Sequence, residues 1–227
     1  MTLLEKALND YSTSSVYLLK DFKNYSTYLH VDLSEKNNLF SGIENSIAFE
    51  KKLNTFLFEN NKLVAYGGYN EIRSIYKRSS HFNSINSLEE RNIHLGIDLW
   101  ATVNTPVIAP IEGVIHSFKN NTAFGDYGPT IILEHCINNI SFFTLYGHLS
   151  LNSISKINIG DKILVGEVIG YLGDHTVNGD YAPHLHFQII HNMEGNKGDF
   201  KGVTSLRDRL KDLKNCPDPN LLLKKDL

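Results

Sequence analysis

Residues 130–146 read TIILEHCINNISFFTLY, two runs rich in Ile, Leu and Phe on either side of Asn138-Asn139. Short runs of this composition, bounded by turn-forming residues, are typical of β-strands. Asn tolerates the positive φ of a tight turn, so the Asn pair predicts a turn between the two strands. This stretch favours an antiparallel β-sheet at the centre of the fold.

The same texture extends from Thr105 to about residue 191, where Gly, Pro, Asn and Asp separate short runs of Val, Ile, Phe and Tyr. The pattern is typical of a mostly antiparallel β domain. The strands that we predict span residues 106–108, 113–118, 130–136, 141–146, 162–164, 167–172 and 185–191.

Helices are predicted on both sides of these strands. From Ser46 onward apolar residues recur at helical spacing, and Asn60-Asn61 would end that helix before a short strand from Val64. Near the C-terminus, a second amphipathic helix is predicted from the i, i+4, i+7 spacing of Leu206, Leu210 and Leu213.

The predicted fold class is therefore mainly β (α+β), with an antiparallel sheet or sandwich as its core. We divide the chain into a partly helical N-terminal flank, residues 1–80, packed on the core, and a β domain, residues 81–227, which the C-terminal helix closes. The flank is expected to cover the core rather than to contribute chemistry. The length of 227 residues favours one large domain with such a flank.

Charge and hydropathy exclude several classes of protein. The 22 Lys and Arg against 25 Asp and Glu give a net charge of −3, so we expect no nucleic-acid partner and no anionic-membrane surface. No stretch approaches the ~20 apolar residues of a membrane-spanning helix. The N-terminus shows no apolar run of a secretory signal, which predicts a cytoplasmic protein, or an extracytoplasmic one if a leader has been removed.

Cys136 and Cys216 lie in no CxxC pair, which argues against thiolate zinc sites and a disulfide framework.

Three histidine clusters stand out among ten histidines: His94-Leu-Gly-Ile-Asp98, Tyr146-Gly-His148, and His184-Leu-His186-Phe-Gln188. In a strand, residues two apart share a face, so His184 and His186 would lie side by side. Two buried imidazoles need partners, and a shared metal ion would supply one. His and Asp are both zinc ligands, and three such ligands leave a position open for water, as catalytic zinc sites require.

The clusters resemble the motifs of the lysostaphin-type (LytM-like) zinc metallopeptidases, a family of peptidoglycan endopeptidases. The resemblance covers residues 91–191, in order: RNIHLGID (91–98), TPVIAPIEGVI (105–115), LYGHLS (145–150), IGDKILVGEVIG (159–170) and PHLHFQ (183–188). It implies a metallopeptidase domain within residues 81–227 that hydrolyses the peptide part of peptidoglycan.

Carried over residue by residue, the resemblance implies one Zn²⁺ per chain, with His94, Asp98 and His186 as its ligands. It also implies that His148 and His184 flank the metal and act as catalytic residues, which orient or deprotonate the attacking water and stabilise the oxyanion. Spacing alone does not show which of these two imidazoles is the base.

The chain departs from the family pattern in places. Gln188 stands where a Glu is usual; it can still bond a ligand imidazole but carries no charge. The loop 173–183 is not the family's Gly-rich loop. In the family that loop lines the substrate groove, so the resemblance leaves the substrate specificity of this chain open. Trp100 is expected mainly in the core, with a groove wall as the alternative; His135 is equally a partner of a ligand or a packing residue; and Glu71 and Arg73 are expected to form a structural ion pair.

Three other functions compete with a peptidase of peptidoglycan. A cytoplasmic peptidase or amidase on a different substrate stays open, as does a non-catalytic zinc-binding or activator module on the same fold. The runs 109–115 and 159–170 are also similar to biotinyl or lipoyl carrier domains. Those domains carry their cofactor on a hairpin Lys, whereas the stretch between these runs holds Tyr146-Gly-His148 and no such Lys motif.

Overall fold

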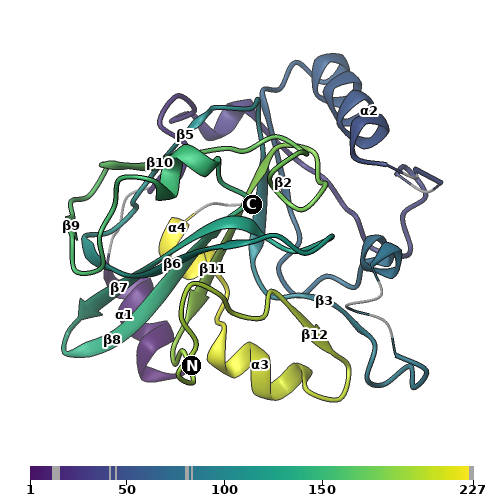
Figure 1. The fold of residues 1–227 in the computed structure, drawn as a ribbon. Coiled ribbons are helices and arrows are strands. Elements are labelled where there is room, and N and C mark those ends of the chain that lie inside the picture. The colour runs from purple at the N-terminus through teal and green to yellow at the C-terminus, as the bar shows by residue number, and fades with distance from the viewer. Residues whose placement is uncertain (12–15, 41, 44, 80–81, 83, 225–227) are drawn as a thin grey trace.

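The computed structural model of the protein describes residues 1–11, 16–40, 42–43, 45–79, 82 and 84–224. Figure 1 shows a twisted sheet with helices around it. In spatial order its eight strands are β1 (Tyr28–His30), β2 (Val64–Gly67), β4 (Ile97–Trp100), β11 (His184–Ile190), β8 (Ile140–Gly147), β7 (Gly128–Ile137), β6 (Gly113–Asn121) and β9 (Lys162–Ile163). All neighbours are antiparallel except β1 and β2, which are parallel.

Two smaller sheets accompany it. One pairs β5 (Pro106–Ile108) with β10 (Val168–Tyr171), and the other pairs β3 (Arg91–His94) with β12 (Val203–Ser205). The mainly β fold class predicted from the sequence is confirmed. All seven predicted strands are present, with ends shifted by at most three residues.

The β7–β8 hairpin forms as its sequence predicts. Ile137 pairs with Ile140, so Asn138 and Asn139 alone make the turn. Their φ angles are +51° and +63°, the conformation that favours Asn in two-residue hairpin loops. The hairpin places Leu133 and Leu145, both fully buried, at the centre of the sheet.

The first 80 residues supply part of the sheet as well as helices. β2 pairs with β4, and β1 extends the sheet beyond it. α2 (Ser46–Glu59) begins where the sequence predicts, because the Asn45 side chain accepts a hydrogen bond from the Ala48 N–H. Its Phe49, Leu53 and Leu57 pack with Trp100 in a core cluster beside β2 and β4.

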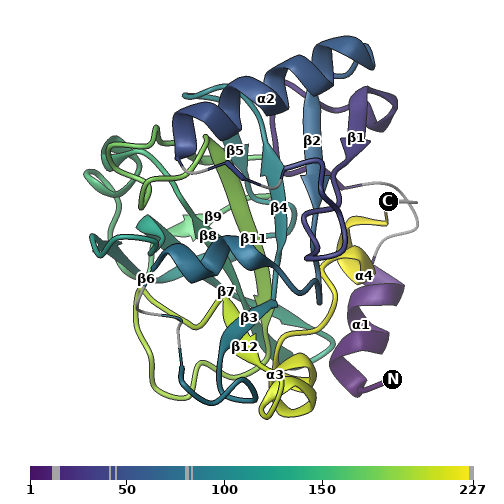
Figure 2. The same cartoon turned by 90° about the vertical axis from the view of Figure 1, so that its right-hand side faces the viewer.

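The first and last helices of the described chain pack together. Figure 2 shows α1 (Leu3–Tyr11) and α4 (Asn220–Leu223) side by side along one flank of the sheet, with α2 across its end. Leu4 and Leu8 of α1 join Leu222 and Leu223 of α4 in the main hydrophobic core. The short α4 therefore supplies the apolar closure that we expected from the helix before it.

The predicted amphipathic face of that preceding helix is wrong for Leu206 and Leu210, whereas Leu213 packs against a core cluster. α3 (Arg209–Asn215) begins after Leu206, and Leu206 and Leu210 are 50% and 84% exposed. The helix turns Asp212 inward instead. The carboxylate of Asp212 accepts bonds from Lys201 Nζ at 2.6 Å and the Thr204 hydroxyl at 2.5 Å, so polar partners decide the orientation of α3.

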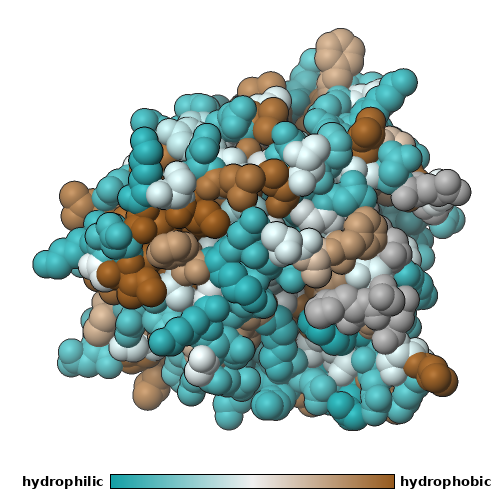
Figure 3. Space-filling view, in the orientation of Figure 1, coloured by the Kyte–Doolittle hydropathy of each residue, from teal (hydrophilic) through white to brown (hydrophobic). Residues whose placement is uncertain are grey.

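The surface is mixed in character. Figure 3 shows a mainly hydrophilic face with separate apolar patches, some of them at the left, where Figure 1 places β9 and β10. Exposed Leu164 and Val165 lie between these two strands. Within the described ranges, no helix combines the length and apolar character that crossing a bilayer requires.

Candidate metal centre

Two neighbouring strands bring the predicted ligands together. β3 ends at His94, a turn through Gly96 follows, and β4 carries Asp98, which lies opposite His186 of β11 in the antiparallel register. Gly96 is required here, because a Cβ at this position would lie 2.7 Å from the His186 ring. His184 and His186 lie on one face of β11, as the strand periodicity predicts.

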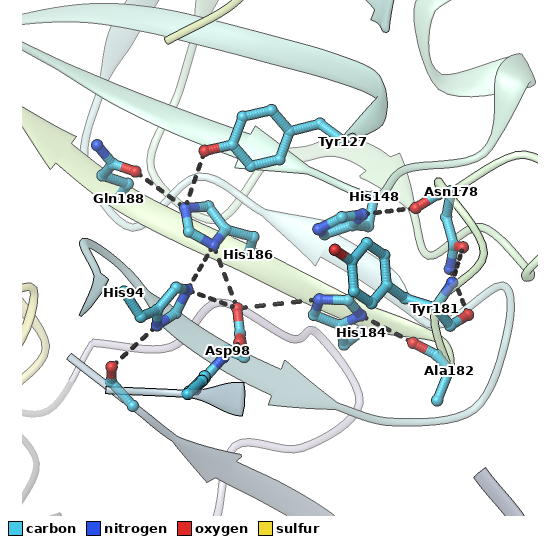
Figure 4. Close-up of polar contacts among 12 residues, drawn as sticks. His94, Asp98, Tyr127, His148, Asn178, Tyr181, Ala182, His184, His186 and Gln188 are labelled. Atoms are coloured by element: carbon cyan, nitrogen blue, oxygen red, sulfur yellow. Dashed lines mark hydrogen bonds and ion pairs between the residues drawn. The ribbon is translucent and has the colours of Figure 1, made fainter. Parts of the chain in front are cut away.

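Three donor atoms converge in this cluster (Figure 4). His94 Nε2 lies 3.3 Å from Asp98 Oδ1 and 2.9 Å from His186 Nδ1, and the latter two atoms are 3.2 Å apart. All three side chains are buried. They could therefore hold a metal ion together. The sequence prediction that these distant residues meet is confirmed.

Hydrogen bonds on the far side of each ring fix which nitrogen faces the cluster. His94 donates from Nδ1 to the Gly68 carbonyl at 2.9 Å, and His186 donates from Nε2 to Gln188 Oε1 at 2.9 Å. The amide of Gln188 donates in turn to the Lys201 carbonyl and to Cys216 Sγ, which makes its oxygen the acceptor for His186. Both facing nitrogens therefore present lone pairs, as metal ligands do.

This donor set fits a zinc ion. Two lone pairs and a carboxylate oxygen that face one another repel unless a cation or a proton lies among them. Ligand atoms at about 2.0–2.1 Å from a tetrahedral ion are roughly 3.3 Å apart, close to the separations between His94, Asp98 and His186. Imidazole and carboxylate are both ligands that zinc accepts.

Two further imidazoles lie beside the cluster. His184 donates from Nδ1 to the Ala182 carbonyl and His148 from Nδ1 to the Asn178 carbonyl, each at 2.8 Å. Each ring therefore keeps an unprotonated Nε2. His184 Nε2 is 3.9 Å from Asp98 Oδ1 (Figure 4). The ring centres of His148 and His184 are 4.1 Å apart. The structure thus brings all five predicted site residues into one place.

The backbone at His148 is strained. Its φ of +63° lies in the left-handed region, which costs free energy for a residue other than glycine. The His148 N–H donates to the Tyr127 carbonyl at 2.8 Å, which helps to hold this conformation. Strain of this kind is concentrated at functional sites, where surrounding contacts maintain it.

Burial sets the charge of the site. It lowers the pKa of His94 and of His184 to about 4, and that of His148 well below its usual range. Burial alone would raise the pKa of Asp98, but the nearby His94 and Arg73 hold it well below its usual range. At neutral pH His94, His148 and His184 are therefore neutral beside an ionised Asp98.

We expect the metal-free protein to lose stability as the pH falls from about 6.5 toward 4. Burial lowers the pKa of His94, His184 and His135 to about 4 from 6.5, so between these values the unfolded chain binds protons that the folded chain does not. Each such group removes about 1.4 kcal/mol of unfolding free energy per pH unit. Urea unfolding with chelator present, repeated across this range, measures the slope; a flat profile would contradict the expectation.

A pocket of about 150 Å³ opens onto the cluster. Its walls include Phe49 of α2, Trp100 of β4 and Tyr181. The Ser46 hydroxyl donates to Asp180 Oδ1 at 2.6 Å, which ties α2 to the loop 173–183. Trp100 fulfils both expectations, because it packs in the core, lines the pocket and stacks on His184 at 5.6 Å between ring centres.

The sequence reading missed residues that contact the predicted ligands. Arg73 forms the expected ion pair with Glu71, at 2.6 Å, but also binds Asp98 Oδ2 at 2.5 Å. The N-terminal flank, residues 1–80, therefore contacts the site through Arg73. The prediction that this flank only covers the core is wrong. The Tyr127 hydroxyl lies 3.4 Å from His186 Nε2. His135 bonds the Glu112 carbonyl and the Thr144 hydroxyl, so packing within the sheet accounts for it.

Comparison with known families identifies the region that carries this site. Residues 92–198 match the model of peptidase family M23. The chain contains a peptidase family M23 domain. The match begins two residues before His94 and includes all five predicted site residues, so the family resemblance inferred from the motifs is confirmed.

Curated relatives of the M23 domain include peptidases of several bacteria. The chain is 34% identical over 119 residues to an uncharacterized metalloprotease of Buchnera aphidicola, covering 50% of this chain and 28% of the relative. It is 32% identical over 98 residues to the peptidoglycan DD-endopeptidase ShyA of Vibrio cholerae, covering 43% and 20%. The glycyl-glycine endopeptidase ALE-1 of Staphylococcus capitis is 31% identical over 103 residues, covering 45% and 26%. The matches thus span between a fifth and a third of these relatives' lengths.

Among solved structures, the chain is similar to the catalytic domain of lysostaphin from Staphylococcus simulans. The two are 25% identical, with a TM-score of 0.43, over 68% of this chain and 96% of that domain.

Proposed function

We propose that the protein is a zinc-dependent metalloendopeptidase that hydrolyses peptide bonds. The observation that carries this proposal is the convergence of His94, Asp98 and His186 beside two neutral imidazoles. Three protein ligands leave a coordination position open, which distinguishes a catalytic zinc site from a closed structural one. The M23 domain supports the assignment as a hydrolase.

In this proposal, His94 Nε2, Asp98 Oδ1 and His186 Nδ1 hold one Zn²⁺ per chain. A bound Zn²⁺ supplies a Lewis acid that polarises a peptide carbonyl and makes water acidic. Asp98 contributes the negative charge of the ligand set through Oδ1. Its second oxygen, Oδ2, forms an ion pair with Arg73. Gln188 holds His186 in the tautomer that offers Nδ1, although it brings no charge of its own.

His148 and His184 handle the proton in this proposal. Each has a free Nε2 and a Nδ1–H that donates to a backbone carbonyl, an arrangement that stabilises the ring when Nε2 takes a proton. Because burial favours their neutral form, a proton accepted at Nε2 is readily passed on to the leaving amine. Either ring in its protonated form donates a hydrogen bond to a developing oxyanion.

The substrate class that we propose is the peptide part of peptidoglycan. Two of the relatives are named as a peptidoglycan DD-endopeptidase and a glycyl-glycine endopeptidase. The aromatic walls formed by Phe49, Trp100 and Tyr181 suit an extended peptide packed against them.

The proposal predicts zinc-dependent hydrolysis. We expect the zinc-loaded protein to release new amino groups from purified peptidoglycan, chelation to remove at least about 99% of this activity, and one equivalent of zinc to restore it. Amine release and metal content are the measurements. If the protein hydrolysed short peptides but not peptidoglycan, its substrate would be a peptide outside the cell wall.

Two results would contradict the enzyme assignment. A protein that carries one zinc yet leaves both peptidoglycan and short peptides intact would be a non-catalytic module on the same fold. If the protein bound no stoichiometric zinc at neutral pH, the assignment of a zinc centre would itself be wrong.

A further inference from the structure

The segment 67–73 lies outside the region that matches the M23 family, yet it contacts two of the three proposed ligands. Gly67 at the end of β2 pairs with Asp98 of β4 in the sheet. The Gly68 carbonyl accepts the Nδ1–H of His94. Arg73 binds the carboxylate of Asp98. The segment therefore contacts His94 Nδ1 and Asp98 Oδ2, the atoms of these two side chains that lie outside the set of three converging donor atoms.

Arg73 and the two ligand imidazoles contact different oxygens of Asp98. Arg73 Nη1 lies 2.5 Å from Oδ2, while Oδ1 is the atom within 3.3 Å of His94 and 3.2 Å of His186. An Arg guanidinium is planar and rigid, so a fixed guanidinium fixes the rotation of the carboxylate that it binds.

Other contacts hold the guanidinium itself. Arg73 Nε lies 2.6 Å from Glu71 Oε2, and the other oxygen of Glu71 accepts the Leu33 N–H at 3.0 Å. Gly68 leaves room for the guanidinium, because a Cβ there would lie 1.7 Å from Arg73 Nη2. Arg73 is only 3% exposed, so it has little freedom to move away.

We infer that Arg73 is a positioning residue of the metal centre, which holds Asp98 Oδ2 so that Oδ1 alone is offered to the ion. The inference rests on the proposed function, because it assumes that Asp98 is a ligand. Residues that orient a metal ligand typically change metal affinity or activity 10- to 100-fold when they are removed. The flank is then a part of the centre and not only a cover.

The test measures zinc affinity in Arg73→Gln. We expect the zinc dissociation constant to rise about 10- to 100-fold, and the visible absorption spectrum of the cobalt-loaded protein to change, because Asp98 is free to rotate or to bind through both oxygens. Arg207→Gln is the matched control: Arg207 pairs with Glu89 on the surface at 2.5 Å and is far more exposed. It should leave affinity and spectrum as in the natural chain.

Arg73→Lys separates position from charge. Lysine keeps the positive charge but has no rigid fork, so we expect it to recover only part of the affinity. Full recovery of affinity and spectrum would assign the effect to charge and overturn the inference. Equal zinc affinity and equal cobalt spectra in Arg73→Gln and Arg207→Gln would overturn it as well.

Glu71→Gln keeps the inference testable if Arg73→Gln does not fold, which urea unfolding shows. Gln has one acceptor oxygen where Glu71 uses two, for Arg73 Nε and for the Leu33 N–H, so the substitution loosens the guanidinium and leaves its contact with Asp98. We therefore expect a severalfold weaker zinc affinity. Unchanged affinity and spectrum in that variant would overturn the inference. If instead the natural chain binds no zinc, the proposed function fails before the role of Arg73 is reached, so the two failures are distinguishable.

Discussion

His186→Ala is expected to lose zinc and hydrolysis together. The substitution removes Nδ1, the atom that lies 2.9 Å from His94 Nε2 and 3.2 Å from Asp98 Oδ1, and leaves two ligands. We expect zinc affinity to fall by more than about 100-fold, the upper range for loss of a mere supporting partner. Metal content after gel filtration, together with amine release from peptidoglycan, measures both losses.

His191→Ala is the matched control for that variant. His191 follows the end of β11, and its side chain is exposed, so its removal should leave metal content and rate unchanged. If His186→Ala retained one full equivalent of zinc at the affinity of the natural chain, His186 would not be a ligand. The donor set proposed here would then be wrong.

His184→Ala is expected to separate the two properties. Its Nε2 lies 3.9 Å from Asp98 Oδ1, outside the set of three mutually close donor atoms, so the zinc content should stay near one per chain. Hydrolysis should still fall, because the site loses a group that holds and transfers the proton. General acid–base residues typically contribute 10²- to 10⁴-fold, so we expect kcat/KM to fall by about that factor.

Two measurements check this separation. Metal analysis of His184→Ala should match that of His191→Ala, while kcat/KM should differ between them by the expected factor. If His184→Ala were as active as the control, the proton would pass elsewhere. Loss of zinc in His184→Ala would instead make His184 a ligand, contrary to the assignment.

The sequence predicted the local features of the fold best. The β7–β8 hairpin depends on Asn138 and Asn139 and on the runs beside them, all within 20 residues, and it forms as expected. α3 did not follow its leucine spacing, because the burial of Asp212 depends on Lys201 and Thr204 as partners. Spacing reports the period of a helix, whereas its orientation depends on neighbours that spacing does not specify.

The candidate site shows the same division. The HxH spacing on a strand predicted that His184 and His186 share a face, and the structure agrees. The sequence predicted only the ion pair of Arg73 with its neighbour Glu71. The contact with Asp98 was missed because Asp98 is 25 residues away and comes close to Arg73 only through the pairing of β2 with β4. Backbone carbonyls fix the tautomers of His94, His148 and His184. Every residue has such a carbonyl, so the sequence could not predict which ones would act as acceptors.

The most direct test of the account is to locate the metal. Crystals of the protein grown with zinc, measured on both sides of the zinc absorption edge, should show one anomalous peak about 2.0–2.2 Å from His94 Nε2, Asp98 Oδ1 and His186 Nδ1. A peak bound by other residues, or no peak among these three atoms in zinc-saturated crystals, would contradict the central claim.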